Sequence, residues 1–372
     1  MTLTVASVRY RALLPAATLL GNGLSVSISG DADAINPAPG DVVIIVKSFS
    51  LGDMALAERC RAARALLVLD LCDNIFVGGY TVADSADPQS SFLRMADVAD
   101  AICVPTDTLA EIVLSYCHGK PVYVIPDGIE TESLLPVYRS LLPTPTLTKK
   151  ISWKRRWREC HETSRERWAR SACLYRRAWR GHRKNLLWFG NHGAAYGRFG
   201  IQDILLFKSA LQRLNALLSV ELTVISNHRE KYQSVAAQLG VASRYVNWTD
   251  SAVHDWLLCA DVVIIPNSLD EFSICKSSNR ALLSLQARVP VVATATAALA
   301  DLEGCLWTGD PYTGLCLYLT DDQEAKTAVE KAQVVIAEHF LPQAIGRLWL
   351  QAISKMQNAH ASATDAPSPS AG

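Results

Sequence analysis

The chain lacks the features that mark secreted, membrane-spanning and zinc-binding proteins. Its ten cysteines include no Cys-x-x-Cys pair and no clustered histidine partners, so we interpret them as small buried side chains in a reducing compartment. No signal peptide is recognisable, because Arg9 and Arg11 interrupt the early apolar run. No stretch reaches the roughly 18 apolar residues of a membrane span. These absences predict a cytoplasmic protein.

Net charge is also absent, since 36 Lys and Arg residues balance 36 Asp and Glu residues. The balance hides a segregation: segment 149–184 holds fourteen basic residues against three acidic ones, a local charge of +11 that leaves −11 for the remainder. Its interleaved aromatic residues are Trp153, Trp157, Trp168, Tyr175 and Trp179. Basic residues with aromatics favour an anionic membrane surface, which predicts a peripheral location on the inner face of the membrane. The alternative is a linker, and the acidic remainder argues against nucleic acid.

A length of 372 residues suggests two domains. Apolar runs alternate with helical stretches, the pattern of a parallel sheet wrapped by helices. Strands are predicted first at Leu3–Val5, Leu24–Ile28, Val42–Val46, Ala65–Leu69, Ala101–Val104 and Val122–Ile125. After the basic segment they are predicted at Leu186–Phe189, Leu222–Ile225, Tyr245–Val246, Val262–Ile265 and Val291–Ala293. We therefore predict an α/β fold of two Rossmann-like, doubly wound domains, at 1–140 and 185–335, joined by a linker or insertion at 141–184.

The segment Lys276–Thr294 joins a polar loop, an apolar helix and a buried strand. Ser277, Ser278 and Asn279 are residue types that cap helices. A helix N-terminus presents unpaired N–H groups and partial positive charge, so with Lys276 and Arg280 beside it we predict a bound phosphate. The alternative is a capped surface helix with two solvated cations.

This segment and Ile125-Pro126-Asp127-Gly128-Ile129-Glu130 together resemble the retaining, family 4-like glycosyltransferases of the group-one superfamily. In that family the pattern seen here at 125–130 ends the N-terminal domain, and the pattern seen here at 276–294 forms the donor-site helix. The resemblance covers most of the chain loosely and about forty residues specifically. It implies the GT-B fold, in which two domains face each other across a cleft, and a closing helix at 336–358. The Ala-, Ser- and Pro-rich tail at 359–372 is predicted to be disordered.

Two positions depart from the family pattern. Leu283 replaces the Glu that usually holds the donor ribose hydroxyls, and Arg288 replaces a Gly. Glu271 lies in the loop before the donor-site helix, close to where the donor sugar is expected, but it does not align with the missing Glu. Donor binding must therefore use another group or be weakened.

The resemblance places further donor-binding residues after the strands of the second domain. Gly190, Asn191, His192 and Gly193 form a loop that resembles the family's glycine-rich loop beneath the donor diphosphate. The GxGxxG spacing of dinucleotide-binding proteins is missing. Trp248 is a candidate stacking wall for the nucleobase, and a buried core tryptophan is the alternative.

Polar residues also follow strands of the first domain, where ligands of parallel sheets bind. Arg9 and Arg11 are candidates to neutralise an acceptor or donor phosphate, or are surface cations. Lys47 follows the third predicted strand, and Asp70 and Asp73 follow the fourth. We expect Asp73 to orient an acceptor hydroxyl with support from Asp70; the alternative for Asp73 is a loop acid that caps the next helix.

These features lead to one functional hypothesis. We expect an enzyme that transfers a hexose-type sugar from a nucleoside-diphosphate sugar to a glycan or lipid-linked acceptor, with retention of configuration as the resemblance implies. No metal or cofactor is expected, because cations and a helix terminus would stabilise the leaving diphosphate. Leu283 favours the alternative, a catalytically weak GT-B-like binding or scaffold protein in membrane polysaccharide assembly.

Overall fold

The computed structural model describes residues 5–82, 85, 87–142, 168, 171, 183–194, 199–249 and 252–364. Contacts within the chain divide it into two compact units. Unit 1 comprises Met1–Pro143, Ile274–Ser277 and Ala337–Gly372; unit 2 comprises Thr144–Ser273 and Ser278–Ile336. The basic segment lies outside the described residues, except for Trp168, Ser171, Arg183 and Lys184.

Unit 1 is built on a parallel sheet whose four strands lie side by side in chain order. They are β1 (Val42–Val46), β2 (Leu66–Asp70), β3 (Ala101–Val104) and β4 (Val122–Val124). Every residue of β2 and β3 is buried, as expected of parallel strands that are covered on both faces. Each strand matches a predicted run to within one residue at either end.

The strand predicted over Leu24–Ile28 is wrong, because these residues pair with no strand. Their burial nevertheless alternates: Leu24, Val26 and Ile28 are partly buried against the core of unit 1, and the residues between them are exposed. One-sided packing of an extended segment produces the same alternation as a strand. Of the strand predicted over Leu3–Val5, only Val5 is described, and it precedes a helical turn.

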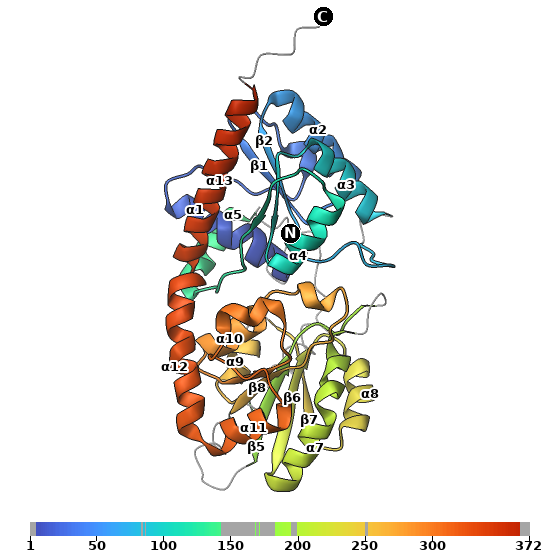
Figure 1. Cartoon of the computed structure of the whole chain (residues 1–372), viewed down its shortest axis with the longest axis vertical. Helices are drawn as coiled ribbons and strands as arrows, with labels where there is room; N and C mark the ends of the chain where they lie inside the picture. Colours follow the sequence, from blue (N-terminus) through green and yellow to red (C-terminus); the bar gives the residue numbers. More distant parts are fainter. Residues whose placement is uncertain are drawn as a thin grey trace, which may run out of the picture. The chain divides into compact units, whose positions relative to one another are not determined.

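Helices cover both faces of the sheet in unit 1 (Figure 1). The connections between consecutive strands form α2 (Leu51–Ala63), α3 (Pro88–Val98) and α4 (Asp107–Tyr116), and right-handed crossovers put them on one face. The core on the other face is formed with α1 (Leu14–Gly21) and α13 (Pro342–Thr364). Short elements complete the unit: η1 (Val8–Leu13), η2 (Ala32–Ala34), η3 (Glu132–Leu134) and α5 (Leu135–Leu141).

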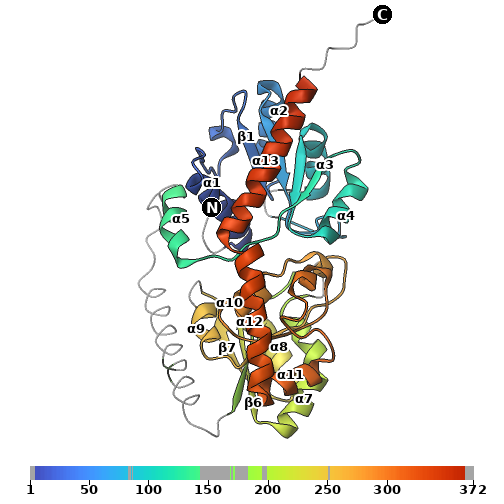
Figure 2. The ribbon, with the colours of Figure 1, turned by 60° about the vertical axis from the view of Figure 1, so that its left-hand side comes forward.

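The last helix belongs to unit 1, where it lies along the sheet and crosses α1 (Figure 2). The crossing is close, since a Cβ atom at Gly346 would lie 2.8 Å from Cβ of Thr18. Trp349 and Ile345 of α13 are fully buried in the core. The helix continues to Thr364, six residues into the tail that was predicted to be disordered. Within these residues His360 contacts the rest of unit 1, with its Nδ1 atom 2.8 Å from Oδ1 of Asp100.

Unit 2 contains a parallel sheet of five strands in the order β7-β6-β5-β8-β9. The strands are β5 (Lys184–Phe189), β6 (Val220–Ser226), β7 (Ala242–Asn247), β8 (Val262–Ile265) and β9 (Val291–Ala293). All five were predicted. The chain builds outward from β5 in one direction and then from β8 in the other, so the direction of winding switches between these two strands. Such a switch point is where ligands of open α/β sheets bind, beyond the carboxyl ends of the strands.

The sheet of unit 2 is covered by helices on both faces (Figure 1). The elements of unit 2 are η4 (Ile201–Phe207), α7 (Lys208–Leu217), α8 (Arg229–Leu239), α9 (Ala252–Leu257), α10 (Asn279–Gln286), η6 (Ala297–Leu302), α11 (Pro311–Thr320) and α12 (Asp322–His339) as far as Ile336. The short η5 (Ser273–Cys275) begins in unit 2, but Ile274 and Cys275 belong to unit 1. Each unit is thus an α/β structure with a parallel sheet. None of the helices in the described part of the chain has the length and apolar character needed to cross a lipid bilayer.

Candidate active site

Arg11 is buried in unit 1, where it binds the ends of two strands. Its Nε and Nη2 atoms donate to the carboxylate of Asp70, at 3.0 and 2.6 Å. Its Nη1 atom donates to the carbonyl oxygen of Ile125 at 2.6 Å and to Asp127 at 3.2 Å. Burial lowers the pKa of Arg11, but the two carboxylates more than offset this and the pKa is raised. Arg11 therefore stays charged and ties the loop after β2 to the loop after β4.

The segment Ile125–Glu130, which carries half of the family resemblance, is held by three further contacts. Arg9 forms an ion pair with Glu130 at 3.0 Å. The backbone N–H of Ile129 donates to the carbonyl oxygen of Phe340 at 2.8 Å. A Cβ atom at Gly128 would lie 2.6 Å from Cγ1 of Ile345, so only glycine fits between the turn and α13. Both predicted phosphate-binding arginines thus hold this turn, and the surface-cation alternative is wrong for Arg11.

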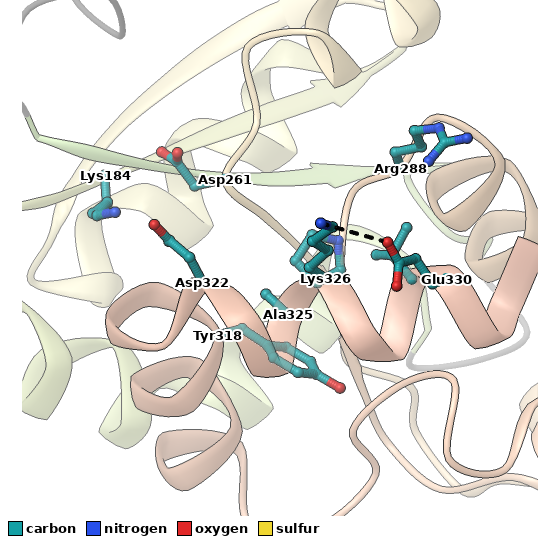
Figure 3. A pocket seen from close by; sticks show the side chains of 10 residues that line it. Lys184, Asp261, Arg288, Tyr318, Asp322, Ala325, Lys326 and Glu330 are labelled. Carbon is teal, nitrogen blue, oxygen red and sulfur yellow. Dashed lines mark ion pairs between the residues drawn. The ribbon is translucent and has the colours of Figure 1, made fainter.

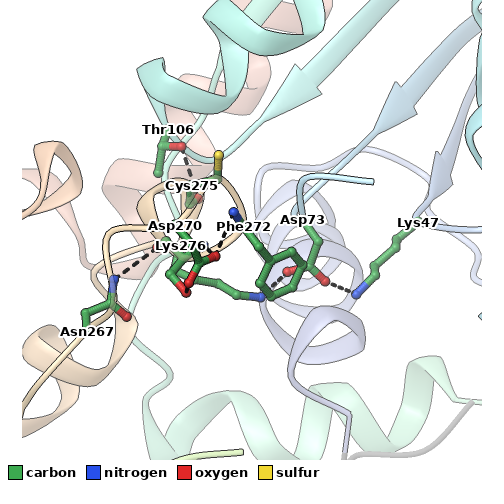
Figure 4. Close-up of polar contacts among 9 residues, drawn as sticks. Lys47, Asp73, Thr106, Asn267, Asp270, Phe272, Cys275 and Lys276 are labelled. Atoms are coloured by element: carbon green, nitrogen blue, oxygen red, sulfur yellow. Dashed lines mark hydrogen bonds and ion pairs between the residues drawn. The ribbon is translucent and has the colours of Figure 1, made fainter. Parts of the chain in front are cut away.

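Asp73 lies between two ammonium groups in unit 1 (Figure 4). Lys47 donates to its Oδ2 atom and Lys276 to its Oδ1 atom. Burial raises the pKa of Asp73, but the two lysines outweigh it and lower the pKa to about 2. A carboxylate with such a pKa is a weak base at neutral pH. The capping alternative for Asp73 is wrong, because the next helix, α3, is capped by Asp87.

Two local features bring the lysines to Asp73. Lys47 follows β1 with a left-handed backbone (φ 43°), a conformation that costs a non-glycine residue roughly 1–3 kcal/mol and turns the chain at the sheet edge. The segment Ile274–Ser277 is fastened to unit 1 by Thr106, whose hydroxyl donates to the carbonyl oxygen of Cys275 at 3.3 Å (Figure 4). The sequence placed Lys47 after a strand but gave no sign of its partner.

The glycine-rich loop of unit 2 is packed backbone against backbone. Gly193 and Gly200 both have positive φ, at 91° and 92°. A Cβ atom at Gly193 would lie 2.2 Å from the carbonyl oxygen of Phe199, and one at Gly200 would lie 2.5 Å from the nitrogen of Gly193. Asn191 accepts from the N–H of Gly193 at 3.1 Å, and Asp203 accepts from the N–H of Gly200 at 3.0 Å. Asp203, which the sequence did not indicate, anchors this loop from a buried position.

Arg280 lies on α10, which follows β8, and its side chain approaches the glycine-rich loop that follows the neighbouring strand β5. A Cβ atom at Gly190 would lie 3.5 Å from its Nη1 atom. Burial lowers the pKa of Arg280, and the charge of Asp203 only partly offsets this. Within the described part of the chain, Arg280 has no acidic side chain at ion-pair distance. A desolvated guanidinium whose only nearby negative charge, that of Asp203, is not at ion-pair distance in the described part of the chain is costly, so this position favours a bound anion.

Helix α10 begins where the sequence predicted, but the predicted side-chain cap is not formed by Ser278. Ser278 occupies the N-cap position, yet its side chain makes no capping hydrogen bond. Ser277 and Asn279 flank it and are partly buried. Leu283, where the resemblance expects a Glu, is partly buried one turn into the helix. The first-turn N–H groups of α10 are therefore not covered by the Ser278 side chain, and they add partial positive charge beside Arg280.

The remaining predicted donor residues are His192 after β5, Trp248 after β7 and Glu271 before α10. His192 Nδ1 lies 2.6 Å from Oδ1 of Asn227, and its carbonyl oxygen accepts from Lys231 at 3.4 Å. Trp248 is partly exposed, and its backbone N–H donates to the carbonyl oxygen of Ser226 at 2.9 Å. Glu271 is exposed. His192 and Trp248 thus lie after the carboxyl ends of β5 and β7, the two strands that flank β6 in one sheet.

A pocket of about 270 Å³ in unit 2 lies at the other edge of the sheet (Figure 3). Lys184, Asp261 and Pro290, at or just before the starts of β5, β8 and β9, contribute to its lining. Arg288, the replacement for the family Gly, also lines it, with a left-handed backbone (φ 61°). This pocket is therefore separate from the residues at the carboxyl ends of the strands.

No protein-family model matches the sequence, and no curated protein sequence matches it. Solved structures match in fold. Sucrose-phosphate synthase from Thermosynechococcus elongatus has a TM-score of 0.55 and 12% identity, covering 86% of this chain and 74% of that one. HepE from Anabaena, in complex with UDP and glucose, has a TM-score of 0.55 and 13% identity, covering 84% and 77%.

A third similar structure, the E. coli trehalose-6-phosphate structure bound with UDP-2-fluoro glucose, has a TM-score of 0.54 and 13% identity. It covers 93% of this chain and 77% of that one. Likeness at this identity shows the fold alone. The chain has the α/β GT-B fold with two Rossmann-like domains, which confirms the predicted fold class.

Proposed function

We propose that the chain is a glycosyltransferase that moves a sugar from a nucleoside-diphosphate sugar to a glycan or lipid-linked acceptor. The observation that carries the proposal is Arg280, a desolvated guanidinium without an acidic partner among the described residues, beside the glycine-rich loop and the N-terminus of α10. A diphosphate supplies the missing negative charge, and backbone N–H groups of the loop and helix are its natural donors. Two structures of similar fold contain UDP with glucose and UDP-2-fluoro glucose, which supports this donor class.

The other residues take roles that follow from their positions. His192 and Trp248 follow β5 and β7, the strands on either side of β6 in unit 2, and are suited to contact the nucleoside, with the tryptophan ring as a stacking surface. Glu271 belongs to the loop before α10, where we place the donor sugar. In unit 1, Asp73 serves the acceptor through the two lysines it holds, and Asp70 and Arg11 fix the loop that carries it. Retention of configuration is part of the proposal and rests on the family resemblance.

The proposed reaction needs charge stabilisation at the leaving diphosphate. Arg280 and the α10 N-terminus are fixed donors, so little reorganisation is needed as negative charge develops there. Leu283 offers no carboxylate for the ribose hydroxyls, which weakens donor binding relative to a chain with Glu at that position. That substitution also favours the second candidate function, a GT-B-like protein that binds nucleotide sugars without turning them over.

A ligand screen tests the proposal. Thermal unfolding is measured with a panel of nucleoside-diphosphate sugars, because a ligand at one hundred times its Kd stabilises a protein by about 2.7 kcal/mol. Release of nucleoside diphosphate from each stabilising donor is then measured, and NMR of the product gives its anomeric configuration. Stabilisation with release supports the transferase, and stabilisation without release supports the binding protein. A chain that neither is stabilised by nor hydrolyses any donor would overturn both.

A further inference from the structure

A buried carboxylate of unit 2, that of Asp203, lies in the first turn of η4, directly after the glycine-rich loop. Only 4% of Asp203 is exposed. Its Oδ2 atom accepts from the N–H of Gly200 at 3.0 Å, and its own N–H donates to the carbonyl oxygen of Gly200 at 3.1 Å. A buried charge is costly, and a neutral side chain would suffice to fix one loop. The carboxylate therefore indicates a further task at this position.

Asp203 also receives hydrogen bonds from a second loop, residues 267–273, which precedes α10. Burial raises the pKa of Asp203. Hydrogen bonds from Gly200 and Ser268, together with the charge of Arg280, offset this rise in its pKa only in part. The glycine-rich loop follows β5, and the loop 267–273 follows β8, the neighbour of β5 in the sheet. One side chain thus joins the two loops on either side of the point where the winding switches.

The loop 267–273 is held together by its own hydrogen bonds. Asp270 accepts from the hydroxyls of Ser268 and Ser273, at 2.7 and 2.9 Å. It also accepts from the N–H of Phe272 at 3.0 Å (Figure 4). The amide group of Asn267 donates to the carbonyl oxygens of Ser268 and Ser273, both at 3.1 Å. A loop bonded in this way moves as one piece, so the contact at Ser268 fixes the position of all its residues.

The negative charge of Asp203 acts on Arg280 without engaging it. Burial lowers the pKa of Arg280, and the charge of Asp203 offsets this only in part. No ion pair joins the two side chains in the described part of the chain. Charges act strongly on one another where water is excluded, so an anion bound at Arg280 is also repelled by Asp203. The carboxylate therefore has two opposite effects on such an anion, through position and through charge.

We propose that Asp203 is a positioning residue of the donor site, which holds the glycine-rich loop and the loop 267–273 beside Arg280 while its charge limits how tightly a diphosphate binds there. This inference rests on the proposed function and deepens it. Arg280 alone would hold the diphosphate of the donor and that of the released product alike. Equally tight binding of both does not speed the chemical step and slows product release. The charge of Asp203 therefore helps the product to leave.

Two variants of the full chain separate position from charge. Asp203→Asn loses the charge but keeps an oxygen that accepts from Gly200, whereas Asp203→Ala loses both. Calorimetry measures the binding of UDP and of inorganic pyrophosphate. We expect Asp203→Asn to bind both severalfold more tightly than the unaltered chain does. Asp203→Ala should bind them at least about tenfold more weakly than Asp203→Asn, the effect of one charged hydrogen bond. Because these two variants carry the same charge, the difference between them reports position alone.

Two further variants complete the test. Asp322→Asn makes the same change of net charge at an exposed acid that lines the pocket at the opposite edge of the sheet, so it should bind UDP as the unaltered chain does. Ser268→Ala keeps the Asp203 carboxylate and removes one hydroxyl that bonds to it. It should weaken UDP binding, and it tests the positioning role even where Asp203→Ala fails to fold.

The outcomes separate this inference from the proposed function. Weaker UDP binding in Asp203→Asn than in the unaltered chain would overturn the inference, as would equal binding in Asp203→Asn, Ser268→Ala and the unaltered chain. If nucleotide sugars still bind and are turned over in that case, the proposed function stands. If pyrophosphate follows the expected order but no nucleotide sugar binds, the transferase is rejected and the role of Asp203 at an anion site stands. A chain that binds neither UDP nor pyrophosphate would overturn both.

Discussion

The guanidinium of Arg11 lies against the carboxylate of Asp70 with two parallel hydrogen bonds, of 3.0 and 2.6 Å, and both side chains are almost fully buried. Removing one partner of such a pair leaves a buried charge without compensation, which typically costs about 3–5 kcal/mol. We therefore expect Arg11→Met to lower the free energy of unfolding by about that amount. Urea unfolding measures the loss.

Arg9→Met is the matched control for that prediction. Arg9 lies two residues away on the same element, but its ion pair with Glu130 is partly exposed, at 17% and 19%. Partly exposed pairs contribute little, so we expect a loss of about 1 kcal/mol or less. Comparable losses for the two variants would contradict the view that Arg11 is the buried link between the loops after β2 and β4.

Asp73 gives a stability prediction that depends on pH. Its pKa is lowered from 3.8 to about 2 in the folded chain, so its folded form binds protons less readily than its unfolded form. The stability contributed by Asp73 is therefore present above about pH 4 and is lost as the pH falls to about 2. The shift corresponds to about 2 kcal/mol.

A comparison of the unaltered chain with Asp73→Asn isolates this effect, because all other titrating groups are shared. Urea unfolding at several pH values between 6 and 2 should show a stability difference that is constant at the upper end and shrinks below about pH 4. A difference that does not change with pH would mean that the lysines do not stabilise the Asp73 carboxylate.

Much of the fold was predictable because its signals are local. Apolar runs located all nine described strands, and the polar run Ser277–Asn279 located the start of α10, whose N-cap residue is Ser278. Leu24–Ile28 misled because an extended segment packed on one side alternates as a strand does. The contacts of the candidate site, in contrast, join residues that are far apart in the sequence. Arg11 and Asp70 are 59 positions apart, and Lys276 and Asp73 are 203 apart. No periodicity encodes such pairings, so the residues could be nominated but their partners could not.

The glycine-rich loop gives a prediction about close packing. Gly193→Ala places a Cβ atom 2.2 Å from the carbonyl oxygen of Phe199, at a φ of 91° that already disfavours alanine. Gly304→Ala is the matched control in unit 2, since Gly304 has a φ of 72° and a Cβ atom there would have no neighbour within 4 Å. We expect Gly304→Ala to cost about 1–2 kcal/mol from backbone strain alone, and Gly193→Ala clearly more. Thermal unfolding of both variants gives the comparison; equal losses would mean that the loop gives way to the methyl group.

The basic segment 149–184 supplies a prediction about membranes, based on its composition. Each basic side chain near an anionic surface contributes on the order of 1 kcal/mol, and salt screens this attraction within about 10 Å at 0.1 M. We expect the chain to sediment with acidic vesicles at low salt, and to do so less as salt rises. Deletion of 149–184 should abolish sedimentation. A chain that stays in the supernatant with acidic vesicles at low salt would favour the linker interpretation.

Arg280 and Arg288 stand at the two ends of α10, which allows a matched test of donor binding. Arg280 is desolvated beside Gly190, whereas Arg288 is exposed and lines the pocket at the opposite edge of the sheet. Arg280→Ala should weaken binding of a stabilising nucleotide sugar by about 1.5–3 kcal/mol, roughly tenfold or more, through loss of a charged hydrogen bond. Arg288→Ala should leave donor affinity unchanged.

Calorimetry on both variants measures the effect, and Arg280→Lys refines it. A lysine keeps the charge but not the forked donor geometry, so an intermediate affinity is expected if a diphosphate oxygen pair is the partner. Removal of a partly buried cation whose desolvation Asp203 offsets only in part also relieves desolvation, so Arg280→Ala should keep or raise the melting temperature of the free chain while lowering its donor affinity. A variant that loses stability without ligand and binds the donor as before would show that Arg280 serves the fold of unit 2, and that the diphosphate has another partner.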